Sequence, residues 1–126
     1  MSTLTVTSIK KTGETASRDA SGVAAAWVNF NQETTPLLVR DSLNVSSVSD
    51  DGNAESTINF NSNMANANYS FAFGVSNGSG FNDAPTLNVD ATAQQPTTST
   101  FGLYSLMAGA LNNALAACVT IHGDLA

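Results

Sequence analysis

Few residues in this 126-residue chain could carry out acid–base or nucleophilic chemistry. His122 is the sole histidine, so a Ser-His-acid triad would have to use it. It lies near the C-terminus, where an exposed strand end is the favoured interpretation. The carboxylates are scattered, and Asp41, Asp50 and Asp51 fall in expected turns, where side-chain oxygens accept hydrogen bonds from nearby backbone amides. A paired-carboxylate glycosidase has no positive support but stays open, because spacing in three dimensions is invisible in a sequence.

Metal binding has equally weak support. The single cysteine, Cys118, excludes an intrachain disulfide and a cysteine-based zinc cluster, and its alternating apolar surroundings favour a buried, inert thiol. Oxygen ligands are closest together at Asp50, Asp51, Asn53 and Glu55, which lack the twelve-residue pattern of an EF-hand. A plain β-turn is favoured there, with loop calcium as the alternative. We therefore predict that the protein is not an enzyme and requires no cofactor.

Charge and hydropathy exclude further classes of protein. The formal net charge is -6, whereas binding to a phosphate backbone needs clustered Lys and Arg. No apolar run approaches the roughly 20 residues of a membrane span, and the N-terminal sequence MSTLTVTSIKK lacks the apolar region of a signal peptide. We expect no nucleic-acid partner, no membrane insertion and no export signal.

The hydrophobic content suggests a thin core. Hydrophobic residues make up 42% of the chain, but many are alanine and only 7% of all residues are aromatic. One domain of this length buries roughly two-thirds of its unfolded surface. Small alanine-rich faces would leave apolar surface exposed on a monomer, so we expect the domain to be completed by neighbouring copies.

The N-terminal residues and the rest of the chain differ in pattern. Leu4, Val6 and Ile9 alternate with Thr and Ser, which predicts a strand over residues 4–9. Residues 10–22 are small and polar and are interpreted as a linker. We therefore divide the chain into residues 1–22, an extension strand and linker, and residues 23–126, a head domain. The extension strand is our candidate anchoring element, able to pair with another chain by strand addition.

Alternating apolar residues dominate the head domain. Strands are expected at residues 23–30, 37–40, 43–49, 55–61, 69–76, 86–90, 99–106 and 115–121. Turns are expected at 41–42 and 50–53, and a hairpin over 107–114 with its turn at 112–113. Residues 23–30 are apolar on both faces, which indicates a central strand covered on each side. This spacing predicts an all-β fold, an antiparallel β-sandwich of about eight strands.

The aromatic residues suggest a core and one exposed loop. We expect the core to contain Trp27, Phe60, Tyr69, Phe71 and Phe73. The glycine-rich stretch at 77–85 is expected to be an exposed loop. An exposed ring beside amides and hydroxyls suits glycan recognition, so our candidate receptor-contact residues are Asn77, Ser79, Phe81, Asn82 and Asp83. A solvated loop with a tucked phenylalanine is the simpler alternative.

Several short stretches occur in a characteristic order. The chain carries AWVNFN at 26–31, VRDS at 39–42, NVSSV at 44–48, DDG at 50–52, TINF at 57–60 and ANYS at 67–70. This order resembles a module of bacteriophage tail-fibre and related virion structural proteins, as do LTVTSI at 4–9 and the VTIHGD ending. The resemblance covers about half of the chain. Gln32 and Glu33 depart from it at a loop, and His122 stands where an aromatic residue is common.

The resemblance implies a virion structural protein made in the infected bacterium, with β-sandwich heads assembled as a homotrimer. Two functions are compatible with it. One is a short tail-fibre-like appendage that contributes to host attachment by contacting a surface glycan or protein. The other is a capsid decoration or tail adaptor protein with a purely structural role. Both functions require contacts with other virion proteins of the tail or capsid, and the sequence does not separate them.

Overall fold

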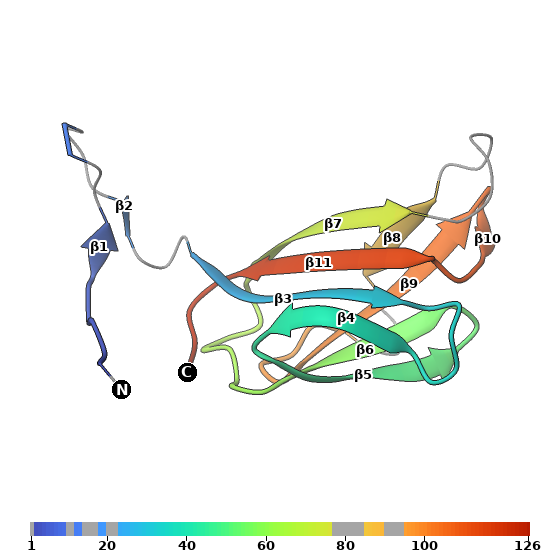
Figure 1. The fold of residues 1–126 in the computed structure, drawn as a ribbon, viewed down its shortest axis with the longest axis horizontal. Coiled ribbons are helices and arrows are strands. Elements are labelled where there is room, and N and C mark those ends of the chain that lie inside the picture. The colour runs from blue at the N-terminus through green and yellow to red at the C-terminus, as the bar shows by residue number, and fades with distance from the viewer. Residues whose placement is uncertain (1, 10–11, 14–17, 20–22, 77–84, 90–94) are drawn as a thin grey trace.

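The computed structural model describes residues 2–9, 12–13, 18–19, 23–76, 85–89 and 95–126 (Figure 1). All secondary-structure elements in these residues are β-strands, and all strand pairs are antiparallel. One sheet has the order β4 (Leu38–Leu43), β3 (Ala24–Asn31), β11 (Ala116–His122) and β7 (Ser70–Ser76). The second has the order β10 (Ala110–Leu111), β9 (Thr100–Met107), β6 (Glu55–Phe60) and β5 (Val45–Gly52), and β8 (Thr86–Val89) also pairs with β9.

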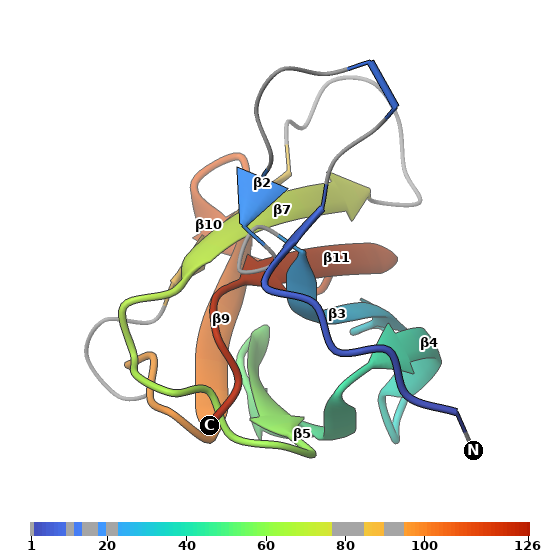
Figure 2. The ribbon, with the colours of Figure 1, turned by 90° about the vertical axis from the view of Figure 1, so that its left-hand side faces the viewer.

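The two sheets form the two layers of a β-sandwich. In the end-on view, β7, β11, β3 and β4 lie in one layer, and β9 and β5 lie in the other (Figure 2). Buried and partly buried residues alternate along β6 and β11, as expected for strands with one face toward a core. The largest fully buried side chains come from both layers and are Phe30, Phe101, Ile58, Met64, Leu103 and Ile121. The expected antiparallel β-sandwich is therefore confirmed. The described residues contain no helix that could cross a membrane.

Part of the expected aromatic core is wrong. Phe60 and Tyr69 are buried, but Trp27 and Phe73 are only half-buried and Phe71 is 41% exposed. Phe71 is exposed because β7 is an edge strand. Trp27 lies opposite Leu43 on the outer face of the four-stranded sheet, so β3 is central in its sheet but has one face uncovered.

The first expected turn is displaced. Instead of turning at residues 41–42, β4 continues to Leu43, and the chain turns at Asn44, which has a φ of 55°. Asparagine tolerates this left-handed backbone region better than most residues. The Asn44 side chain accepts a 2.7 Å hydrogen bond from the Ser62 backbone N–H and donates a 3.0 Å bond to the Ser62 carbonyl. Those contacts with a distant segment could not be read from local sequence.

Two hairpins lie at one end of the sandwich, which we call the distal end (Figure 1). The expected hairpin between β5 and β6 is present, but its turn lies at Asn53 and Ala54 rather than over residues 50–53, and three consecutive residues from Gly52 to Ala54 have positive φ. The hairpin expected after residues 99–106 is different: β9 pairs with the short β10 through a turn at Ala108 and Gly109, at φ 51° and 80°, rather than at residues 112–113, and β11 lies in the other sheet. A two-residue turn with both φ values positive matches the twist of the adjoining strands.

The N-terminal residues lie beside the opposite end, where β3 begins and β11 ends, which we call the proximal end (Figures 1 and 2). The expected strand over residues 4–9 is reduced to β1 (Ser8–Ile9). It pairs with β2 (Arg18–Asp19), which lies inside the expected linker. Leu4 and Val6 are 85% and 44% exposed and lie outside any strand. We call residues 2–9 the N-terminal arm.

The C-terminal residues are fixed to the proximal end of the sandwich. Leu125 forms an isolated bridge with Met64, and the Ala65 N–H donates a 2.8 Å hydrogen bond to the Asp124 carbonyl. Gly123 lies so close to Tyr69 that a Cβ atom built on the glycine would be 2.8 Å from the tyrosine Cβ. The C-terminal segment is therefore an integral part of the head domain.

Candidate functional site

The residues singled out in the sequence do not form one site. The expected receptor-contact residues Asn77, Ser79, Phe81, Asn82 and Asp83 lie outside the described residues. Of the anchoring residues, Leu4 and Val6 have exposed side chains, and the Ile9 backbone is part of β1.

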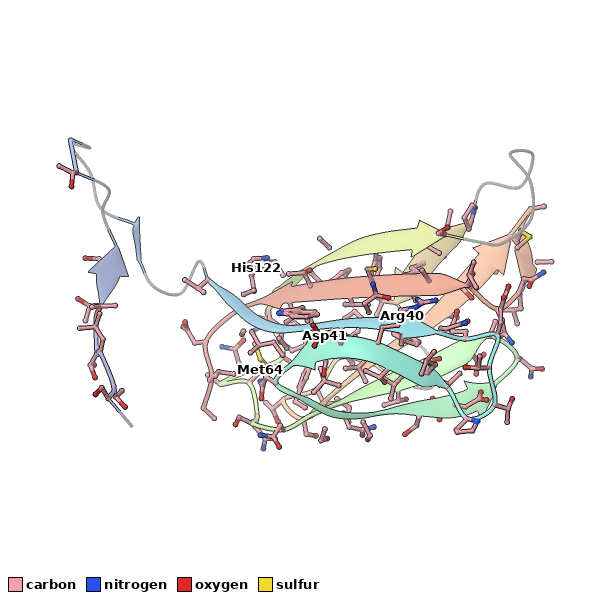
Figure 3. All side chains as sticks on the ribbon, in the orientation of Figure 1. Arg40, Asp41, Met64 and His122 are labelled. Atoms are coloured by element: carbon pink, nitrogen blue, oxygen red, sulfur yellow. The ribbon has the colours of Figure 1, made fainter. Side chains whose placement is uncertain are left out.

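The histidine lies at the opposite end of the sandwich from the acidic residues that were considered for metal binding. His122 is half-buried on β11 at the proximal end (Figure 3), opposite Ala24 and Ser70 on the neighbouring strands. Asp50 and Asp51 lie at the distal end in the β5–β6 hairpin. Asp50 accepts a 3.0 Å hydrogen bond from the Gly52 N–H, and Asp51 accepts a 2.9 Å bond from the Thr57 hydroxyl. Among the described residues, no three His, Cys, Asp or Glu side chains are placed to hold a metal ion.

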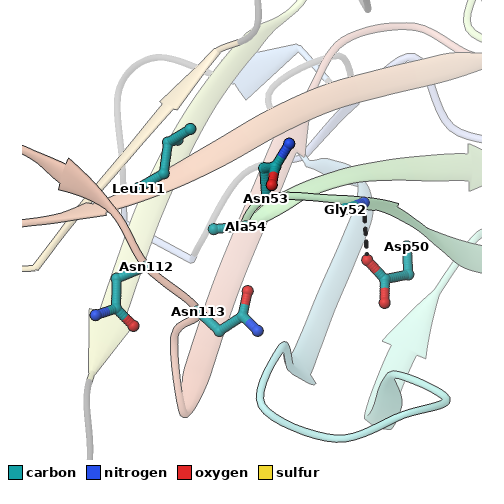
Figure 4. Close-up of a pocket in the computed structure, with 7 residues that line it drawn as sticks. All are labelled: Asp50, Gly52, Asn53, Ala54, Leu111, Asn112 and Asn113. Atoms are coloured by element: carbon teal, nitrogen blue, oxygen red, sulfur yellow. Dashed lines mark hydrogen bonds between the residues drawn. The ribbon is translucent and has the colours of Figure 1, made fainter.

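A polar depression of about 410 Å³ lies at the distal end (Figure 4). The β5–β6 hairpin contributes Asp50, Gly52, Asn53 and Ala54. The segment between β10 and β11 contributes Leu111, Asn112 and Asn113. We call these seven residues the distal depression. Segments about 60 positions apart in the chain therefore form one surface.

The buried side chain of Gln32 connects the two segments. Its Nε2 group donates hydrogen bonds to the Ala54 carbonyl at 3.2 Å and to the Ser56 hydroxyl at 3.1 Å. Its Oε1 atom accepts bonds from the Ser105 hydroxyl at 2.8 Å and from the Ala114 N–H at 3.0 Å. All four hydrogen-bonding positions of the amide are used, which a buried polar group requires. Gln32 is only 3% exposed, so its role is to hold the depression in shape.

Backbone hydrogen bonds strengthen this support. The Gln32 N–H donates to the Ala114 carbonyl at 2.9 Å, and the Ser105 N–H donates to the Ala54 carbonyl at 3.0 Å. The Asn112 N–H donates to the Ser105 carbonyl at 3.2 Å, and the single Ser105 hydroxyl proton is shared between Gln32 Oε1 and the Asn112 carbonyl. Both walls of the depression are thus attached to β9 and to the end of β3.

The side chains around the depression differ in direction. Asn113 points toward the side occupied by Asp50, whereas the Asn112 amide points away (Figure 4) and lies 3.9 Å from the Met107 sulfur. Leu111 is 50% exposed. The surface available to a ligand therefore combines one carboxylate, the amides of Asn53 and Asn113, and one aliphatic side chain.

The sequence indicated parts of this site but not their association. The stretches at 50–53 and 112–113 both predict Asx-rich turns, and the first leads into the turn at Asn53 and Ala54. Nothing local shows that they meet. Gln32 was interpreted as a loop substitution, and its buried role depends on partners between 22 and 82 positions away.

Comparisons with known proteins gave no match. A scan against protein-family models found no matching family, and searches of curated proteins and of solved structures found no similar protein.

Proposed function

We propose that this chain is a bacteriophage virion structural protein, a short tail-fibre-like appendage that contributes to attachment to the host surface. The observation that carries the proposal is the unequal character of the two ends of the molecule. An arm with exposed apolar residues lies beside the proximal end, and a polar depression lies at the distal end (Figure 1). The order of sequence stretches shared with phage tail-fibre modules supports the same function.

The N-terminal arm is suited to anchoring. Leu4 is 85% exposed and Val6 is 44% exposed, and burying an aliphatic side chain of this size contributes about 1.5–3 kcal/mol. Residues 2–6 lie outside any strand of this chain, so their backbone groups are available to a neighbouring sheet. The arm therefore attaches the head to another virion protein of the tail or capsid.

A homotrimer of heads is part of the proposal. The edge strand β4 exposes Leu38, Val39 and Leu43, at 51%, 37% and 47%. Leu43 lies opposite the half-buried Trp27 on the uncovered face of the same sheet. Contact between copies would cover this apolar surface. Closed symmetry would limit the assembly to a fixed number of copies instead of an open filament.

Replacing Leu4 and Val6 together with Asn tests the anchoring role. The variant should fold but be lost from purified particles, as measured by immunoblotting of virions and by circular dichroism of the isolated protein. The matched control replaces Thr3 and Thr5, which are exposed in the same segment, with Ala. Normal incorporation of the Asn variant would refute anchoring by the arm.

A structural role as a decoration or adaptor protein is the second candidate. The exposed leucines of β4 favour it, because such a role needs an apolar contact face rather than a free distal end. Particles carrying substitutions in the distal depression distinguish the two functions. Slower adsorption to host cells supports attachment, whereas normal adsorption supports the structural role.

A further inference from the structure

We propose that the distal depression binds a neutral saccharide through adjacent hydroxyl groups. The inference rests on the proposed function, because it names the class of host-surface ligand that the distal end would contact. It concerns residues 50–54 and 111–113 and makes no use of the loop at 77–83.

The polar groups of the depression match sugar hydroxyls. Each hydroxyl both donates and accepts hydrogen bonds, and an asparagine amide offers both a donor and an acceptor. No hydrogen bond joins the side-chain amide of Asn53 or Asn113 to another described residue. One Asp50 oxygen accepts the Gly52 N–H, which leaves the second oxygen for a ligand hydroxyl. Asp50 and Asn113 lie on different walls, so a pair of neighbouring hydroxyls can contact both.

Charge favours a neutral ligand. Among the described residues, the lining includes the carboxylate of Asp50 and no Lys or Arg. Asp51 lies next to Asp50 in the chain, and the net charge of the protein is -6. Acidic sugars and phosphate groups would be repelled by this field. Among the described residues, no three His, Cys, Asp or Glu side chains are grouped here to hold a metal ion.

Leu111 supplies the apolar part of the surface. Its side chain is 50% exposed at the rim of the depression. A sugar ring has C–H groups on one face and hydroxyls at its edge, so it can contact an aliphatic side chain and amides together. A fully charged or fully polar ligand would leave Leu111 uncovered.

The rigidity of the walls makes binding by so few groups feasible. The Gln32 side chain holds the Ala54 carbonyl and the Ala114 N–H at 3.2 and 3.0 Å. Because the backbone is held before the ligand arrives, little conformational entropy is lost on binding. The depression is open and shallow, so we expect millimolar affinity for one sugar, and a trimer would increase the overall affinity by presenting three sites.

Nuclear magnetic resonance of the intact 15N-labelled protein tests the inference. The probes are the methyl glycosides of glucose, galactose and mannose, with N-acetylneuraminic acid as the acidic comparison. At least one neutral glycoside should shift the backbone amide signals of residues 50–54 and 111–113, with saturation near about 10 mM. N-acetylneuraminic acid should cause no saturable shift at the same concentrations.

Two variants assign the contacts. Asn113→Ala removes an amide that makes no hydrogen bond to another described residue, and Asp50→Asn keeps an oxygen for the Gly52 N–H. Each should weaken binding about tenfold, as expected for a lost hydrogen bond to a ligand. The control Asp51→Asn removes the same charge from a residue outside the depression. It should change the affinity less than twofold, because a surface charge outside the site is screened by salt.

Three results would overturn the inference: no shift with any of the three neutral glycosides, shifts confined to other residues, or equal binding by both variants and the wild type. The proposed function is tested separately by incorporation of the Leu4 and Val6 variant into particles. A failed titration with loss of that variant from virions would reject the saccharide and retain the appendage.

Discussion

The hydroxyl of Ser105 donates a 2.8 Å hydrogen bond to the side-chain carbonyl of Gln32, and this bond joins residues 73 positions apart in the chain. Gln32 lies just beyond the end of β3 in one sheet, and Ser105 lies on β9 in the other. The bond therefore connects the two layers of the sandwich directly beneath the distal depression.

Replacing Gln32 with Ala should destabilise the head. The Ala114 N–H would lose its side-chain acceptor and the Ser56 hydroxyl its donor, and an unpaired buried polar group costs about 1–3 kcal/mol. Urea denaturation should show this loss, whereas Asn63→Ala, at an exposed side chain, should have little effect. Equal stability of the two variants would mean that the Gln32 network is not important for folding.

Gly123 should tolerate no side chain. A Cβ at this position would lie 2.8 Å from the Tyr69 Cβ and 2.9 Å from the Met64 methyl group. The methyl group can move, but the Tyr69 Cβ is attached to the backbone, so Gly123→Ala should cost about 1–3 kcal/mol. Gly74→Ala is the matched control because its new Cβ would meet Cys118 at an ordinary 3.5 Å. Thermal unfolding that ranks the two variants in the opposite order would contradict the predicted clash.

The two phenylalanines Phe101 and Phe71 should differ in their contribution to stability. Their ring centroids are 5.1 Å apart, but Phe101 is fully buried and Phe71 is 41% exposed. Phe101→Ala should therefore cost about 3–5 kcal/mol. Phe71→Ala should cost less than half as much, because much of its ring already contacts water. A larger loss for Phe71 in chemical denaturation would show that another surface covers it.

Tyr69 should make stability depend on pH in the alkaline range. Burial raises the pKa of the Tyr69 hydroxyl from 10.0 to about 12, and this hydroxyl lies 3.1 Å from the Thr97 and Thr100 carbonyls. The unfolded chain loses the Tyr69 proton first, so the stabilisation is complete below pH 10 and is lost as the pH rises toward about 12.

The Tyr104→Phe variant isolates this titration, because the chain has only two tyrosines. Tyrosinate absorbance should appear with a midpoint near 12 in the folded variant and near 10 in denaturant. Coincident midpoints would show that Tyr69 is not buried.

The sequence predicted the sandwich because its strands alternate apolar and polar residues and are separated by Gly, Asn and Asp. It failed where structure depends on distant partners. Asn44 forms a turn supported by Ser62, and Gln32 is buried only because β6, β9 and residue 114 supply its hydrogen bonds. Trp27 was expected in the core because alternation identifies two faces of a strand but not which face another layer covers. The distal depression could not be predicted because its two walls meet only after folding.

Electron cryomicroscopy of assembled particles tests the central proposal most directly. We predict that the heads project from the virion as trimers, with the N-terminal arm contacting a tail or capsid protein and the β5–β6 hairpin pointing away. The appendage function would be contradicted if the particle showed no density for the head. It would also be contradicted if the distal end of the head were packed against the capsid.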